Sequence, residues 1–353
     1  MVLSESKEFS DHSDDRATTK GGAAAKVGAL VSMVAVQAIT AGYFALTNVI
    51  VVNGMSSTVV LVYQYILATV FMGFLAVIFE RKNRPPLTLK IFLSIFLLAF
   101  VGITLAQNLM AGCLYFISST VDTAVINMVP VFTYILSVIT REEKLEINTL
   151  WGKGKLIGTL ISVGGALTLM SWRGSSLLSS SSMGHWILGL AMVVLGVLAF
   201  SSWILMLRPM VNMYPAEFSL TALMFLCATF QTAILAAILS HNNASDWTLK
   251  WNLELILIVF GGVLNSGIAN LLYTWSASVK GPIFVATFSP LTYVFTTILD
   301  VAFLGSSLYL GSVIGSIVIV VGLYMYLWSK SKEDEKASAI EDQQTSISSP
   351  LLV

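Results

Sequence analysis

Amide side chains recur inside long apolar runs of this sequence, where other polar residues are few. They are Gln37, Gln64, Gln107, Asn108, Asn127, Gln231, Asn265 and Asn270. An amide in an apolar medium is costly unless it is paired, so each one marks either a hydrogen bond between helices or a contact with a ligand. Both interpretations stay open for any single amide. As a set, the amides predict a polar binding region inside an otherwise apolar protein.

Aromatic side chains in the same runs could complete such a region. Tyr43, Trp203, Tyr273 and Trp275 could stack on a planar solute or hold an ammonium group by cation–π attraction, although a single aromatic is more often core packing. From the two groups we predict one set of residues that lines a binding cavity. The set is Gln37, Gln107, Asn108, Asn127, Trp203, Asn270 and Tyr273.

The sequence lacks several kinds of chemistry at these positions. No Lys or Arg lies in the middle of an apolar run, so a phosphorylated or nucleotide-linked solute is disfavoured. The three histidines, His12, His185 and His241, lie in tails or loops, and they predict no metal or haem site. No pairing of a nucleophile with a base is visible. We therefore expect no enzymatic activity, no cofactor and no nucleic-acid partner.

Four acids lie near the ends of the apolar runs: Asp122, Glu217, Glu254 and Asp300. Asp300 is the deepest, and it is a candidate for proton coupling, with a partnered carboxylate at a helix end as the alternative. Transport without protons is equally compatible with the sequence. The two cysteines, Cys113 and Cys227, lie inside apolar runs and are predicted to be buried free thiols.

The elements that must position these residues are membrane-spanning helices. Apolar residues make up 56% of the 353 residues and charged residues only 11%, far from the composition of a soluble protein. A helix that crosses a bilayer needs about 20 apolar residues. Ten runs of this kind are visible, at 28–51, 56–79, 90–115, 121–140, 154–172, 186–207, 216–239, 253–277, 282–304 and 308–328. The sequence predicts an all-α, multipass membrane protein.

The basic residues predict its orientation. Seventeen of the 19 Lys and Arg residues lie in the tails and in alternate loops, and only Arg173 and Lys250 lie in the opposite loops. By the positive-inside rule both termini face the cytosol, which also requires an even number of spans. The glycosylation candidate Asn243, in an Asn-Ala-Ser sequon, then lies in a loop on the outer or lumenal side.

The two halves of the sequence share proline and glycine residues at a nearly constant offset. Pro130 recurs 160 residues later as Pro290, and the triplet Gly154, Gly158 and Gly165 recurs 157 residues later as Gly311, Gly315 and Gly322. Five spans per half would make the second half inverted, with a binding site near the membrane midplane. The predicted organisation is a cytosolic tail (1–26), a first five-helix repeat (27–172), a serine-rich linker (173–185), a second repeat (186–328) and a cytosolic tail (329–353).

These repeated residues predict two different roles. Pro130 and Pro290 lie within the fourth and ninth runs, where proline removes a helical hydrogen bond. The resulting kinks are either settled by packing or open the helices where a solute passes, with the carbonyls of Ile126 and Ala286 freed. The glycines are spaced by four and seven residues on one helix face, which predicts close packing of the fifth and tenth helices.

Several segments resemble a known family. They are 280–284 (Lys-Gly-Pro-Ile-Phe), 288–291 (Phe-Ser-Pro-Leu), 308–315, 322–333, 127–130 (Asn-Met-Val-Pro) and 141–144 (Arg-Glu-Glu-Lys). Over nearly all of residues 28–333 the chain is similar to the plant EamA-domain transporters, the walls-are-thin-related or nodulin-like members of the drug/metabolite transporter superfamily. It departs from them in having Gln64 in place of an arginine, and Ser306-Ser307 in place of a glutamate.

The resemblance implies ten helices in two inverted five-helix bundles. It also implies transport of amino acids, or of auxin and related organic solutes, across the plasma membrane or the vacuolar membrane. We predict amino-acid efflux or facilitation by alternating access, with auxin transport as the alternative and a receptor or scaffold without transport as the rival class. The expected partners are the solute and the lipid bilayer, and a homodimer is compatible with the sequence.

Overall fold

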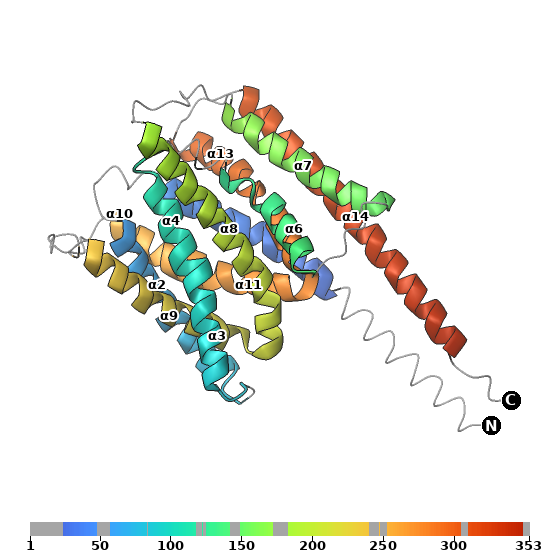
Figure 1. Cartoon of the computed structure of the whole chain (residues 1–353), viewed down its shortest axis with the longest axis horizontal. Helices are drawn as coiled ribbons and strands as arrows, with labels where there is room; N and C mark the ends of the chain where they lie inside the picture. Colours follow the sequence, from blue (N-terminus) through green and yellow to red (C-terminus); the bar gives the residue numbers. More distant parts are fainter. Residues whose placement is uncertain are drawn as a thin grey trace. The chain divides into compact units, whose positions relative to one another are not determined.

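The computed structural model describes residues 24–47, 57–82, 84–117, 122, 125–141, 149–171, 183–239, 247, 253–304 and 310–348. This described part is all-helical, as predicted, and contains no strand (Figure 1). The glycosylation candidate Asn243 and most of the predicted linker 173–185 lie outside the described residues.

The helices follow the apolar runs closely. Besides a helix at Ala24–Thr47 they are α2 (Ser57–Phe79), α3 (Leu89–Ala99), η2 (Phe100–Leu105), α4 (Ala106–Cys113), α6 (Val129–Ile139), α7 (Leu150–Ser171), α8 (Met183–Met213), α9 (Glu217–Leu239), α10 (Leu253–Val259), η4 (Phe260–Ala269), α11 (Asn270–Lys280), α12 (Pro282–Thr287), α13 (Leu291–Leu304) and α14 (Leu310–Ser348). Within the described residues, eight helices are long and apolar enough to cross a membrane. The chain is an integral, multipass membrane protein, and a total of ten spans remains a prediction.

Two of the long helices contain a π-helical segment. The helix Leu89–Cys113 contains η2, and the helix Glu254–Lys280 contains η4. The two segments begin at Phe100 and at Phe260, 160 positions apart, which is the same offset that relates the two prolines. A π-helical turn widens the backbone and is often found at functional sites.

The described helices divide into two compact units. Unit 1 comprises residues 1–100 and 206–285, and unit 2 comprises residues 101–205 and 286–353. Each unit therefore combines segments from both predicted repeats.

In unit 1, α2 and α9 pack against each other in antiparallel directions (Figure 1). The ring of Phe79, at the end of α2, stacks on Phe218, near the start of α9, at 5.5 Å between centroids. At the opposite end, Val59 and Val62 of α2 form a buried cluster with Ala236 of α9. The two helices have the same length, 23 residues, and their first residues are 160 positions apart.

In unit 2, α7 and α14 form a second antiparallel pair (Figure 1). A Cβ atom added at Gly158 would lie 2.8 Å from the carbonyl oxygen of Gly322, and one added at Gly165 would lie 2.9 Å from that of Gly315. Only glycine allows two backbones to approach this closely. The predicted packing role of these glycines is confirmed.

Both proline positions coincide with a helix end, so the expected kinks are breaks. Asn127 and Met128 form a turn, α6 begins directly after it, and Pro130 is the second residue of α6. Pro290 lies in the turn between α12 and α13. Proline is well accommodated at a helix start, where its missing N–H has no helical partner in any case. The carbonyl of Ala286, predicted to be freed, accepts a hydrogen bond from the N–H of Ser289 at 3.0 Å.

Candidate functional site

In unit 1, the helix Ala24–Thr47 packs along the helix that contains η4. A Cβ atom at Gly28 would lie 3.0 Å from the ring of Trp275, and one at Gly42 would lie 3.2 Å from the ring of Phe260. Since residue numbers rise on one helix as they fall on the other, the pair is antiparallel. Glycines on the first helix admit the large rings of the second, which brings polar groups of both helices together.

These polar groups form a cluster beside η4. The hydroxyl of Tyr43 donates to Oε1 of Gln64 at 3.2 Å, and Nε2 of Gln64 donates to the carbonyl of Leu257 at 3.4 Å. The hydroxyl of Thr40 donates to Oδ1 of Asn265, within η4, at 3.3 Å. Gln64 is only 1% exposed, so these bonds satisfy an amide that water does not reach. We call Thr40, Tyr43, Gln64 and Asn265 the polar cluster of unit 1.

Unit 2 repeats the arrangement with different side chains. Here α8 packs along η2 and α4 in antiparallel directions: Gly189 faces Ile117, and Gly196 faces Met110. Trp203 of α8 lies directly against Gly102 of η2. Its ring also stacks on Phe200 at 5.4 Å. Trp203 follows Tyr43 by 160 positions, and each aromatic residue lies against a glycine of a π-helical segment, Gly102 in unit 2 and Gly261, 159 positions later, in unit 1.

The residues predicted to line a cavity are divided between the units. Unit 1 holds Gln37 and Tyr273, which are buried, and Asn270, which is half-buried. The Oδ1 atom of Asn270 is enclosed and has no hydrogen-bond partner in the described part of the chain. Three members of the polar cluster, Tyr43, Gln64 and Asn265, were not among the predicted lining residues, although all three were candidates from the sequence.

Unit 2 holds the other four predicted lining residues. Asn127 is 1% exposed at the break before α6, and Trp203 is buried against η2. Asn108 is half-buried, and its side-chain nitrogen donates to the carbonyl of Thr104 in the preceding turn at 2.7 Å. Gln107 is exposed on the surface of unit 2.

The acids show a different pattern from the one expected. Asp300 lies on α13, but its side chain is outside the described part of the structure. Asp122, expected at a span end within reach of water, is 8% exposed and accepts a hydrogen bond from the thiol of Cys113 at 3.2 Å. Both cysteines are buried free thiols, as predicted.

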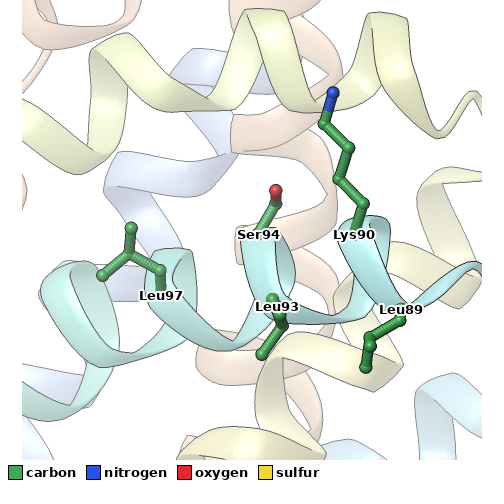
Figure 2. A pocket seen from close by; sticks show the side chains of 5 residues that line it. All are labelled: Leu89, Lys90, Leu93, Ser94 and Leu97. Atoms are coloured by element: carbon green, nitrogen blue, oxygen red, sulfur yellow. The ribbon is translucent and has the colours of Figure 1, made fainter.

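An open groove runs along the outer surface of α3, and it contains none of the predicted lining residues (Figure 2). Leu89, Lys90, Leu93, Ser94 and Leu97 line it, with Lys90 and Ser94 pointing to the same side of the helix. The three leucines are 52% or more exposed, as expected of side chains that face lipid rather than a solute.

Known proteins share this fold and this sequence pattern. The model of the EamA-like transporter family matches residues 28–171 and 187–328, which is most of the chain.

The chain belongs to the EamA-like transporter family.

Curated relatives of this EamA protein place it among the plant members, which confirms the resemblance seen in the sequence. One WAT1-related protein of Arabidopsis thaliana is 30% identical, over 89% of this chain and 91% of its own length. A second is 33% identical, over 83% of this chain and 84% of its own length. A third is 34% identical, over 82% of each chain.

A solved structure shares the fold of this EamA protein at low sequence identity. This crystal structure matches 86% of this chain and 98% of its own, with a TM-score of 0.67 and 15% identity. At that identity the likeness concerns the fold alone. The family assignment and the apolar helices together establish a membrane transporter of the EamA family.

Proposed function

We propose that this protein moves amino acids across a membrane by alternating access, as an exporter or a bidirectional facilitator. The observation that carries the proposal is the break before α6, where Asn127 is 1% exposed and directly precedes the proline-containing helix start. Transporters bind their solutes where membrane helices are discontinuous, because the interrupted backbone and nearby polar side chains can contact the solute. A buried amide at such a break is suited to hydrogen-bond a carboxylate or an ammonium group.

The internal symmetry supports the proposed mechanism. Helices α2 and α9, which are equivalent by the 160-residue offset, pack in antiparallel directions, and so do α7 and α14. Equivalent helices of a parallel repeat would point the same way, so these pairs favour two inverted five-helix repeats. In inverted-repeat transporters, one repeat or bundle moves against the other to open the site to each side in turn.

The buried charges support an uncharged or zwitterionic solute. Among the described residues, Lys155 is the only buried Lys or Arg, and its Nζ lies 2.8 Å from both carboxylate oxygens of Glu333. The charge of Lys155, near the start of α7, is therefore already neutralised. A solute with two or more negative charges would need an available cation, whereas an amino acid carries its own.

Auxin-type acids are the second candidate. They share the carboxylate with amino acids but replace the ammonium group with a planar ring, which Trp203 or Tyr273 could stack against. We further propose that both termini face the cytosol and that the protein resides in the plasma membrane or the vacuolar membrane. A receptor or scaffold without transport is the rival that the following experiment excludes or supports.

Uptake into proteoliposomes tests the proposal. We expect saturable flux of radiolabelled amino acids in the wild type and its loss in Asn127→Ala. The matched control is Gln231→Ala, since Gln231 is an amide of a long helix that bonds the carbonyl of Phe96 and is not among the lining residues. Flux of indole-acetate alone would select the auxin alternative. Binding without flux of either solute would contradict the proposal and favour a receptor.

A further inference from the structure

A buried carboxylate in unit 2 has few groups that could stabilise its charge. Asp122 is 8% exposed, and its described hydrogen bond comes from the thiol of Cys113. That same sulfur lies 3.0 Å from the carbonyl of Met110, so a single weak S–H donor is shared between two acceptors. An ionised carboxylate can accept about four hydrogen bonds. The described residues therefore offer the anion fewer hydrogen bonds than water would.

The groups that face Asp122 do not include a cation in the described part of the chain. Cys113 faces it from α4, and the phenol of Tyr293 lies within electrostatic range of it from α13. Ion pairs of described residues involve Lys155, Lys330 and Lys332, all of them with glutamates of α14. Both neighbours of Asp122 are acids of low strength, which cannot neutralise a negative charge.

Because Asp122 is buried without a described cation beside it, its protonation should depend on whether water can reach it. Burying an ionised carboxylate without a cation costs several kcal/mol, and a carboxyl group avoids that cost by binding a proton. When the group is enclosed as in this structure, it binds a proton more readily than a carboxyl group in water does. When a conformational change opens the site to water, the ionised form is favoured and the proton leaves.

The position of Asp122 connects it to the moving parts of a transporter. It lies five residues before Asn127, at the break that precedes α6. It is also within electrostatic range of Tyr293, three residues after Pro290 in the second broken span. A change of charge at Asp122 therefore acts on both discontinuous helices.

We propose that Asp122 carries a proton that is coupled to solute transport, and this inference rests on the proposed function. The carboxylate takes a proton from water on one side of the membrane, is enclosed as the neutral acid, and returns the proton to water on the other side. Cys113 positions the carboxyl group through its hydrogen bond, and neither Cys113 nor Tyr293 takes part in the proton's release. Asp300, the candidate from the sequence, is the rival carrier.

Infrared difference spectroscopy of the purified protein tests the protonation without any solute. We expect a carboxylic-acid C=O band that is present at acidic pH, is lost as the pH is raised, and is absent from Asp122→Asn at every pH. The asparagine keeps the shape and an acceptor for the Cys113 thiol, so the fold is preserved. A wild-type spectrum without a band assignable to Asp122 would overturn the proposal.

Flux measurements then test the coupling. In proteoliposomes with an imposed pH gradient, the wild type should accumulate radiolabelled amino acid, and Asp122→Asn should accumulate no more than protein-free vesicles while still exchanging labelled for unlabelled solute. Asp300→Asn should retain accumulation. Accumulation that persists in Asp122→Asn, or flux in the wild type that ignores the gradient, overturns this inference but leaves the transporter proposal intact. Absence of all flux and exchange in the wild type contradicts the transporter proposal itself.

Discussion

Units 1 and 2 build a similar contact with different chemistry. In each unit a long helix lays an aromatic residue against a glycine of a π-helical segment, Tyr43 at Gly261 and Trp203 at Gly102. In unit 1 the aromatic hydroxyl continues into hydrogen bonds with Gln64 and, through it, with the carbonyl of Leu257. In unit 2 the indole stacks on Phe200 instead.

The difference suggests that the duplicated fold requires a glycine at this helix contact, whereas the side chain opposite the glycine can vary. Each contact has a glycine because two helices can approach closely only where a side chain is missing. The side chains opposite them differ because an apolar ring and a hydrogen-bonded phenol both fill the space. Unit 1 therefore concentrates polar contacts around η4, while the corresponding position of unit 2 is mainly apolar.

The glycines of the π-helical segments should give the largest effect when substituted. In Gly262→Ala, the new Cβ would lie 2.8 Å from the carbonyl oxygen of Gln64 and 2.7 Å from Cβ of Leu67. These atoms cannot move without shifting α2, so we expect a loss of about 1–3 kcal/mol or more in the free energy of unfolding. Gly102→Ala should be comparably harmful, since its Cβ would overlap the indole of Trp203.

A rescue experiment separates the two glycines. Pairing Gly102→Ala with Trp203→Leu should restore much of the stability, because the obstacle is a side chain, whereas no side-chain change should rescue Gly262→Ala. Gly73→Ala in unit 1 and Gly164→Ala in unit 2 are controls with no atom within 4 Å of the added Cβ. They should be neutral or stabilising, since alanine favours a helix. Thermal unfolding in detergent measures the stability of all these variants. Equal stability of Gly262→Ala and Gly73→Ala would refute the claim that the π-helical glycines are required for close helix packing.

The ion pair that joins α7 to α14 should give the next largest effect. The side chain of Lys155 is 7% exposed and that of Glu333 is 24% exposed. Lys155→Ala therefore leaves a partly buried carboxylate whose remaining ion pair among the described residues is with Lys330, at 3.3 Å. We expect a loss of about 2 kcal/mol, less than for a fully buried pair. Lys332→Ala, which breaks the exposed pair with Glu335, should cost about 0–1 kcal/mol.

The same thermal unfolding measurement tests the pair, with the exchanged variant Lys155→Glu/Glu333→Lys as a further check. The exchange should recover part of the stability that Lys155→Ala loses. If Lys155→Ala and Lys332→Ala have the same small effect, the ion pair between Lys155 and Glu333 does not stabilise the contact between α7 and α14. That contact would then depend on the glycines rather than on the ion pair.

Much of the fold could be predicted from the sequence because the membrane imposes simple rules. Apolar length located the long helices, and the recurring glycines located the contact between α7 and α14. The division into two units could not be predicted, because each unit combines segments of both halves, and that depends on long-range packing. The breaks at Pro130 and Pro290 were expected as kinks, since proline marks a disturbance of a helix without specifying its size.

The candidate site was predicted less completely, for a physical reason. An amide in an apolar run looks the same in sequence whether it bonds a neighbouring helix, as Gln64 does, or is exposed, as Gln107 is. The π-helical segments have no sequence pattern as clear as a proline. Asp122 was placed at the water boundary because its position in the run was known, but the contacts that bury it were not.

The smallest predicted effect lies in the polar cluster of unit 1, and a double-mutant cycle measures it. Tyr43→Phe and Gln64→Leu each remove one partner of the hydrogen bond, and their coupling free energy should be about 0.6 kcal/mol, and at most about 1.7 kcal/mol. Tyr65→Phe is the matched control, because the hydroxyl of Tyr65 is buried without a hydrogen-bond partner among the described residues. Its cycle with Gln64→Leu should give no coupling, and Tyr65→Phe alone should be neutral or stabilising. If both cycles give the same coupling free energy, the hydrogen bond between Tyr43 and Gln64 contributes no stability beyond packing. The two units would then differ only in the shapes of these side chains.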